Sequence, residues 1–519
     1  MDKFIQDASV TRCDSSATPQ PGWPLSAHDS ALPSTNLDSD LDTFATELRM
    51  ACDIVVRFHR RLADARVTPA STQPEIAATF DEPLPQSPQA IEAILGEVES
   101  RVFANSTFYQ SPRFYGYING SGSHAGILAE LLSATVNQLC AKWHFAPAAA
   151  EVERRVIRWL AEFIGYVPNA AGCLLSGGSA GNLVGLALSR ASAGVSDVHR
   201  RGLASLPPMT VYVSHEGHAS LDRAMGLLGL GRDQLRRIQV RDDFTIDVDA
   251  LANHVATDRA AGFQPIAVVG NAGTTNTGAV DPLHSLADFC RREGLWFHVD
   301  AAYGGPAART SVAGTLFQGL DRADSVVVNA HKWLHVPAEA SCILVKDARM
   351  LSDTFRMSAD YLREESGDAG AGAIDFKDLG PQLSRSFRAL KVWVTFKAYG
   401  TERLRDVVES NVRIMRHLAD RIDASDDFVR LAPVPLSVVC FQYRPPHARG
   451  RDDPSYLDDL NHRLCDALER DGRVFLSATK IHGRRVLRAC SINHRLTKAD
   501  ADFLLDVVRD VGGRLVRSG

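Results

Sequence analysis

Long apolar runs, paired cysteines and basic clusters are all missing from this sequence. No stretch of about 18 uninterrupted apolar residues occurs, so a transmembrane helix is not expected. The nine cysteines are dispersed, without a CxxC pair or metal-ligand spacing. This argues against a disulfide framework and a metal site, and is typical of reduced thiols. Basic residues are interspersed with acidic ones and the net charge is −5, so neither nucleic acid nor an anionic membrane is expected as a partner.

The first residues also lack the apolar run that a signal peptide requires. They read MDKFIQDASVTRCDSS and are largely polar, so we expect a cytoplasmic protein. Residues 14–42 are rich in Ser, Asp, Pro and Ala but contain few large apolar side chains. Such a composition buries too little surface to offset the entropy of ordering the chain, and we predict a mobile lead-in over residues 1–42.

The remaining chain has the composition of an ordinary globular protein, with 45% hydrophobic and 23% charged residues among 519. Apolar residues recur at helical spacing between Thr43 and Val67, which predicts an amphipathic helix within an N-terminal helical segment, residues 43–110. A large domain is predicted over residues 111–400. A small α+β domain is predicted over residues 401–519, in which SVVCFQYRP and VLRACSIN are strands.

The predicted large domain alternates short apolar runs with helical stretches. Buried strands are expected at CLLSGG, VYVS, IAVVGNAG, LWFHVDAA and SVVVNAHKWL, with helical patterns such as AGNLVGLALSRA between most of them. This alternation predicts an α/β fold with a mostly parallel sheet covered by helices. Ligands bind at the carboxyl ends of the strands in such sheets, so functional residues are expected there.

Two residues of complementary chemistry follow predicted strands. Asp300 lies in FHVDAAYGG, and Lys332 lies thirty-two residues later in VVVNAHKWL. In enzymes that use pyridoxal 5′-phosphate (PLP), a lysine amine forms an imine with the cofactor aldehyde, and a carboxylate keeps the pyridine nitrogen protonated. An aspartate at a strand end is more often a cap or one half of an ion pair, so the flanking residues decide between the two interpretations.

Eight short motifs flank and include this pair, in the order SPRFYGY, WHFAPAAAEVE, SGGSAGN, GHAS, GNAGTTNTGAVDPL, HVDAAYGG, NAHKWL and RSFRALKVW. From about Pro112 onwards the chain resembles the group II PLP-dependent decarboxylases, which act on aromatic amino acids, histidine, glutamate and diaminobutyrate. The resemblance implies PLP fold type I, with a PLP-binding large domain. It also implies decarboxylation of an L-amino acid to the amine and CO₂, through an external aldimine and a quinonoid.

The resemblance further implies which residues bind the cofactor. Lys332 matches the imine lysine, His218 matches a histidine that stacks on one ring face, and Ala302 matches the small residue on the other face. The turn SGGSAGN opens a predicted helix, whose free N–H groups favour a phosphate. The implied cofactor contacts are Gly178, Ser179, His218, Thr275, Asp300, Ala302, Asn329, His331 and Lys332.

The substrate contacts follow from the same resemblance. SPRFYGYINGSG aligns with a pocket wall that is aromatic in the aromatic amino-acid decarboxylases, and Ala141 stands where that pocket has a large aromatic residue. These changes alter the shape and polarity of the pocket and argue against a simple DOPA or tryptophan enzyme. The candidate substrate residues are Tyr109, Tyr117, Asn119, His144 and Arg488.

The catalytic loop is where the chain departs from the family pattern. Many members carry a loop tyrosine that protonates the reacting carbon, and the aligned residue here is Phe376, which has no proton to give. Loss of this tyrosine is associated in plant and insect relatives with aldehyde synthases, which consume O₂ in an oxidative deamination. Tyr361, in SADYLREESGDAGAGA, is an alternative proton donor, or it packs at the base of the loop.

Four functions remain open at this point. An amino-acid decarboxylase comes first and an O₂-consuming aldehyde synthase second. A PLP-dependent aminotransferase or lyase is third, and a non-enzymatic binding protein is last, because Lys332, Asp300 and His218 are all present. The resemblance and the amphipathic N-terminal helix together predict a homodimer with shared active sites.

Overall fold

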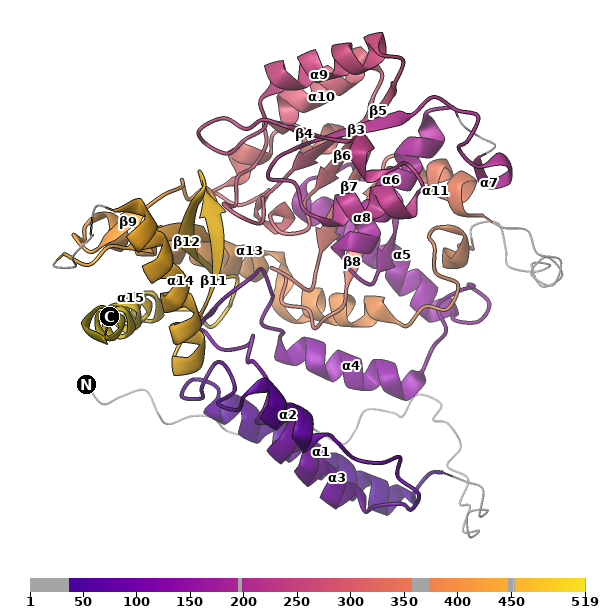
Figure 1. Ribbon diagram of the computed structural model, residues 1–519. Coiled ribbons are helices and arrows are strands. Elements are labelled where there is room, and N and C mark those ends of the chain that lie inside the picture. Colours follow the sequence, from indigo (N-terminus) through magenta and orange to yellow (C-terminus); the bar gives the residue numbers. More distant parts are fainter. Residues whose placement is uncertain (1–36, 195–197, 357–372, 447–450, 452, 519) are drawn as a thin grey trace.

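The computed structural model describes residues 37–194, 198–356, 373–446, 451 and 453–518 (Figure 1). Most of the predicted lead-in, residues 1–36, and Tyr361 lie outside these ranges. No helix among the described residues combines the length and apolarity needed to cross a bilayer.

The large domain contains a seven-stranded sheet in the order β2-β8-β7-β6-β5-β3-β4. Strands β7, β6, β5, β3 and β4 are parallel, and β8 is antiparallel to both of its neighbours. The predicted mostly parallel sheet is thus confirmed, with β8 as the reversed strand. The bounds are β2 Ala171–Leu175, β3 Met209–Ser214, β4 Leu235–Ile238, β5 Gln264–Asn271, β6 Trp296–Asp300, β7 Ser325–Asn329 and β8 Ser341–Val345.

Helices cover both faces of this sheet. Alternate residues of β3 and β5 belong to different hydrophobic clusters, because successive strand side chains point to opposite faces. Val211 and Val269 pack with α6 (Gly178–Ser192) and α8 (Ser220–Leu227), whereas Tyr212 and Val268 lie in the cluster of α9 (Val248–Ala260) and α10 (Leu283–Glu293). The other helices of this part of the chain are α5 Pro147–Ile164, α7 Val198–Arg201 and α11 Ala348–Phe355.

The C-terminal part forms a separate five-stranded sheet in the order β1-β11-β12-β10-β9. Its edge strand β1 comes from far upstream in the sequence and pairs in parallel with β11. The helix α13, Arg388–Asp423, leads into this region and breaks at Gly400 (φ 69°), where the domain boundary is predicted. The other bounds are β1 Phe114–Tyr115, β9 Phe428–Arg430, β10 Val438–Tyr443, β11 Phe475–Ile481, β12 Arg484–Cys490, α14 Pro454–Asp471 and α15 Lys498–Ser518.

The N-terminal helices lie together at one side of the molecule (Figure 1). The predicted amphipathic helix is present as α1 (Leu41–Arg61), capped by the Asp40 side chain. Below the large domain, α4 (His124–Val136) packs on α13 (Figure 1), yet much of its apolar surface remains exposed. The bounds of the remaining elements are α2 Gln73–Thr79, α3 Ile91–Glu97 and a π-helical segment Val98–Phe103. The exposed apolar side chains along and just after α4 are Leu128, Leu131, Leu132, Val136, Leu139 and Phe145.

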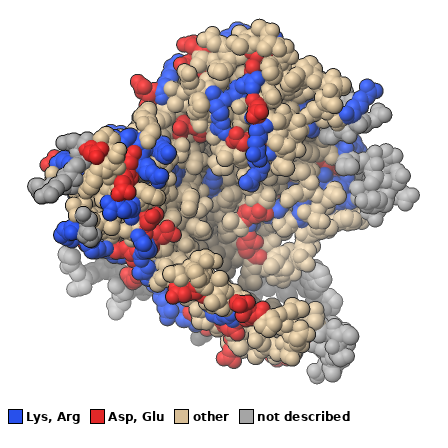
Figure 2. Space-filling model, viewed as in Figure 1, with Lys and Arg blue, Asp and Glu red and all other residues tan. Residues whose placement is uncertain are grey.

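Charged side chains of both signs are mixed over the visible surface (Figure 2). No large area of one sign is evident on this face, in agreement with the interspersed charges of the sequence.

Candidate active site

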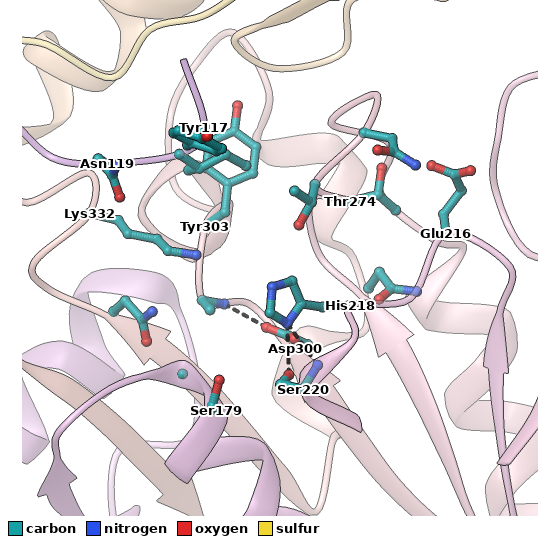
Figure 3. Close-up of a pocket in the computed structure, with 18 of the residues that line it drawn as sticks. Tyr117, Asn119, Ser179, Glu216, His218, Ser220, Thr274, Asp300, Tyr303 and Lys332 are labelled. Carbon is teal, nitrogen blue, oxygen red and sulfur yellow. Dashed lines mark hydrogen bonds between the residues drawn. The ribbon is translucent and has the colours of Figure 1, made fainter. Parts of the chain in front are cut away.

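The carboxyl ends of the large-sheet strands meet at one cavity of about 500 Å³ (Figure 3). Asp300 ends β6, Lys332 follows β7, His218 follows β3, and Ser179 lies in the first turn of α6. The cavity is also lined by residues of the small sheet, among them Ser477 and Arg488. The structure brings together these predicted site residues: Tyr117, Asn119, Gly178, Ser179, His218, Thr275, Asp300, Ala302, Asn329, His331, Lys332 and Arg488.

Lys332 is held by the packing of the residue that follows it. The Trp333 ring is fully buried and stacks on Tyr303, with ring centroids 5.0 Å apart, and its Nε1–H donates to Asn411 Oδ1 at 3.0 Å. The backbone at Gly120 lies so close to the backbone of Lys332 that a Cβ added to Gly120 would be 2.2 Å from the Lys332 carbonyl oxygen. Burial lowers the pKa of the Lys332 amine, and the nearby Asp300 opposes this shift. A lowered pKa favours the neutral amine that attacks a carbonyl.

Asp300 is oriented by two hydrogen bonds. The Ala302 N–H donates to Oδ1 at 3.1 Å, and Asn182 Nδ2 donates to Oδ2 at 2.8 Å. Both donors fix the orientation of the carboxylate, whose two oxygens accept these hydrogen bonds. Asp300 can therefore present negative charge to a cationic ring nitrogen.

Asn182 joins Asp300 to His218 through a chain of hydrogen bonds. Its Nδ2 also donates to Ser220 Oγ at 2.8 Å, and Ser220 Oγ lies 2.8 Å from His218 Nδ1. The Ser220 N–H donates to the same Nδ1 at 3.1 Å, so the ring hydrogen of His218 is on Nε2. Burial also lowers the pKa of His218, which favours the neutral ring.

The series of hydrogen bonds continues from Asn182 into the core. Since both Nδ2 hydrogens of Asn182 are donated, its Oδ1 must accept, and His298 Nε2 lies 3.0 Å away as the donor. His298 Nδ1 lies 2.8 Å from Ser325 Oγ, which accepts from Trp296 Nε1 at 2.9 Å. Burial lowers the pKa of His298 to about 4, and the ring is therefore neutral. The orientations of Asp300 and His218 are thus fixed from within the core.

The start of α6 provides an anion site. Its N-cap Gly177 makes no side-chain cap, so the first N–H groups of the helix point out of it. A Cβ on Gly178 would lie 3.0 Å from Asn329 Nδ2 and 3.3 Å from the Ala302 side chain, so a larger residue would narrow the cavity. These N–H groups, the hydroxyl of Ser179, the Lys332 amine and Asp300 match the phosphate, aldehyde and ring nitrogen of PLP. The residues present therefore fit this cofactor.

The small sheet contributes Arg488. Its Nε donates to the Thr275 carbonyl at 2.8 Å, and its Nη1 lies 3.2 Å from the Tyr117 carbonyl and 3.3 Å from Ser477 Oγ. The buried Nη2 has no hydrogen-bond partner in the described part of the chain. A cationic group with an unmatched nitrogen at a cavity wall is suited to a carboxylate.

Three predicted residues lie elsewhere, and a fourth is outside the described ranges. Tyr109 packs edge-on against Phe114, and His144 is exposed beside Phe145; neither lines the cavity. Phe376 is 2% exposed in a 3₁₀ turn, with its ring against Arg385, whose buried ion pair with Glu153 fixes this region. The prediction that Phe376 replaces a proton donor at the reacting carbon does not agree with this core position. Tyr361 cannot be placed, because it lies outside the described residues.

Several residues that line the cavity were not predicted from the sequence. Asn182 and Asn276 stand inside motifs that were recognised, and Glu216 precedes His218 by two residues in SHEGHAS. Polarity at these strand ends was the signal available for finding them. The other missed residues are Ile118, Ser220, Asn271, Gly273, Thr274, Tyr303, Ser477, Ala478 and Thr479.

Comparison with known proteins agrees with the fit to PLP. A family model described as the pyridoxal-dependent decarboxylase conserved domain matches residues 74–444. The chain belongs to this family. It is accordingly a PLP-dependent carboxy-lyase of fold type I, and PLP is its cofactor.

Relatives of this decarboxylase include enzymes with different products. An aromatic-L-amino-acid decarboxylase of Bacillus atrophaeus is 31% identical over 465 residues, covering 89% of this chain and 94% of the relative. A phenylacetaldehyde synthase of Petunia hybrida is 31% identical over 414 residues, covering 78% and 81%. Among solved structures, mouse CSAD in its apo form has a TM-score of 0.86 at 27% identity, covering 91% of this chain and 99% of the other. Oryza sativa TDC with PLP and tryptamine also has a TM-score of 0.86, at 25% identity, covering 94% and 100%.

Proposed function

We propose that this decarboxylase converts an L-amino acid to the corresponding amine and CO₂. The observation that carries the proposal is the joining of Lys332, Asp300 and His218 in one cavity with the unmatched guanidinium nitrogen of Arg488. When bound, PLP supplies a ring that accepts the electron pair released as CO₂ leaves. The protein itself binds and orients the substrate, and this orientation favours cleavage of the bond to the α-carboxylate over the other bonds of the α-carbon.

Each of these residues receives a role from its surroundings. Lys332 would hold the cofactor covalently through its amine. Asp300, fixed by Asn182 and Ala302, keeps negative charge beside the ring nitrogen. Gly178 and Ser179, at the start of α6, hold the phosphate. Borohydride reduction followed by peptide mapping tests the first role, and the label is expected on Lys332.

Arg488 and His218 act on the substrate in this proposal. Arg488 Nη2 binds the α-carboxylate and orients it before CO₂ departs. His218 carries a hydrogen on Nε2 and lines the cavity, so it is one candidate for holding a proton near the reacting carbon. Tyr361 stays a second candidate from the sequence.

Analysis of all products on an amino-acid panel tests the proposal. Amine and CO₂ are expected in equal amounts, without O₂ uptake. The presence of phenylacetaldehyde synthases among the relatives gives a second candidate, an O₂-consuming aldehyde synthase. Phe376, on which the sequence argument for this candidate rests, is buried in the core and does not line the cavity in the described part of the chain. Stoichiometric O₂ consumption with aldehyde, ammonia and peroxide would establish that second function instead.

We also propose a cytoplasmic homodimer in which α4 contributes to the interface. The exposed apolar side chains of this helix, Leu128, Leu131, Leu132 and Val136, recur at a spacing that places them on one helix face. A second copy of the chain is the occupant proposed for this surface, as the family resemblance implies. The eight cysteines of the described residues are free thiols, which supports a reducing compartment.

A further inference from the structure

The cavity has two acidic side chains in the described part of the chain, Asp300 and Glu216. Asp300 is engaged by Asn182 and Ala302 and faces the proposed position of the ring nitrogen. Glu216 lies on the wall opposite Lys332, with His218 and Thr274 between them (Figure 3). No role in binding PLP follows for Glu216 from this position.

The negative charge of Glu216 is poorly compensated. Its Oε2 is buried without a hydrogen-bond partner, and the side chain of Asn276 is the neighbour that hydrogen-bonds the carboxylate. Burial raises the pKa of Glu216, as expected for a carboxylate that has lost water without gaining a cation. Glu216 forms no ion pair with any described residue; His482 is the nearby basic group that interacts with its charge.

The side chains that hydrogen-bond around Glu216 are neutral, and the nearby Arg237 guanidinium is already bonded to the Gly217 carbonyl and to Asp222. Thr479 Oγ1 donates to Asn276 Oδ1 at 2.9 Å, which leaves the Asn276 amide hydrogens for the carboxylate. Thr274 and Ser477 also line the cavity. Arg488 donates to the backbone carbonyls of Thr275 and Asn276 and does not neutralise Glu216. A cation that arrives with a ligand would complete this site.

We propose that Glu216 binds the cationic end of the substrate side chain, so that the preferred substrate is an L-amino acid ending in an ammonium, guanidinium or imidazolium group. This inference rests on the proposed decarboxylation. The two unmatched groups then divide the substrate between them, with Arg488 on the α-carboxylate and Glu216 on the distal cation. An isolated carboxylate also selects against neutral side chains, because binding one leaves the charge buried and unpaired.

Matched pairs of ligands test this inference. The holoenzyme is compared on lysine and norleucine, and on ornithine and norvaline, by kcat/KM for CO₂ release. The product amines 1,5-diaminopentane and pentylamine are compared by calorimetric titration, which needs no turnover. Wild type is expected to prefer the basic member of each pair by about 10²-fold or more, and Glu216→Gln is expected to reduce this preference to within several-fold. Glu162→Gln, at an exposed carboxylate outside the cavity, is the matched control, and its preference is expected to stay near that of the wild type.

The outcomes separate this inference from the proposed function. Equal binding of the two amines by wild type, or an unchanged preference in Glu216→Gln, overturns the role of Glu216, whatever the rate of CO₂ release. If no CO₂ is released from any amino acid while the diamine still binds more tightly through Glu216, the decarboxylation proposal fails and the cation site stands. Loss of the preference in Glu162→Gln to the same degree as in Glu216→Gln also overturns the assignment.

Discussion

The side chains of Asp300 and His218 cannot be considered separately, because both depend on Asn182. The amide of Asn182 donates to each branch and accepts from His298, so its orientation is fixed on all sides. The sequence contains Asn182 within SGGSAGN, but no local pattern reveals that it reaches β6 and α8 at the same time. Residues that act through tertiary contacts of this kind are the ones that motif analysis misses.

Replacing the carboxylate of Asp300 tests its role in the ring chemistry. Asp300→Asn keeps the size of the side chain and can still bond to Asn182 or Ala302, so the folded protein is expected to retain PLP. Turnover is expected to fall by about 10²-fold or more, because a neutral amide cannot stabilise positive charge on the ring nitrogen. Steady-state kinetics and the visible spectrum of bound PLP measure the two effects. Near-normal turnover in the variant would mean that Asp300 has only a structural role.

His298 makes the stability of the fold depend on pH. Burial lowers its pKa from 6.5 to about 4 in the folded state, so the unfolded chain binds more protons between these values. The stabilising contribution is present above pH 6.5 and is lost as the pH falls toward 4. The slope from this residue is at most about 1.4 kcal/mol per pH unit. Denaturant midpoints from pH 7.5 to 4.5 are expected to fall with pH, and less steeply in His298→Gln. An equal slope in both proteins would contradict this assignment.

At the scale of elements, the start of α6 offers a matched pair of glycines. Gly178→Ala places a Cβ 3.0 Å from Asn329 Nδ2 and 3.3 Å from Ala302, inside the proposed phosphate site. Gly177→Ala meets nothing within 4 Å, and its backbone is extended (φ −173°, ψ 171°), so any residue can adopt it. The dissociation constant for PLP is expected to rise about tenfold in Gly178→Ala and to change little in Gly177→Ala. Similar values for both variants would place the phosphate elsewhere.

The strands of the large sheet were predictable because buried parallel strands are short continuous apolar runs. The predicted runs overlap β2, β3, β5, β6 and β7 and include the residues at their carboxyl ends, whereas β4 was not predicted. The reversed strand β8 carried the same pattern but no functional residue, and it was not identified. Tyr109, His144 and Phe376 were assigned from sequence similarity in segments outside the strands. Sequence similarity in such segments does not establish the direction of a side chain.

For the whole molecule, the exposed surface of α4 predicts self-association. Leu132 is 56% exposed near the middle of this helix, so Leu132→Glu is not expected to disturb the core of the protomer. A charge on each side of the proposed interface is expected to shift the protein from dimer toward monomer in sedimentation. Leu316→Glu, at another exposed apolar side chain (39%) away from α4, serves as the control. A monomeric wild type would refute the proposed interface.

Hydrogen bonds between the large domain and the C-terminal part of the chain lie within and beside the active site. Arg488 of β12 donates to a carbonyl of the large domain, and Tyr303 Oη lies 2.6 Å from Ser437 Oγ. Trp333, beside Lys332, donates to Asn411 of α13. Separation of the C-terminal part would therefore free the Trp333 indole and the guanidinium together, and would loosen the segment that carries Lys332. A chain cut at the Gly400 break should not leave a large domain that can still retain PLP. The yellow colour of the bound cofactor should then disappear in the same transition in which the two sheets part, which makes the cofactor a visible reporter of the integrity of the whole chain.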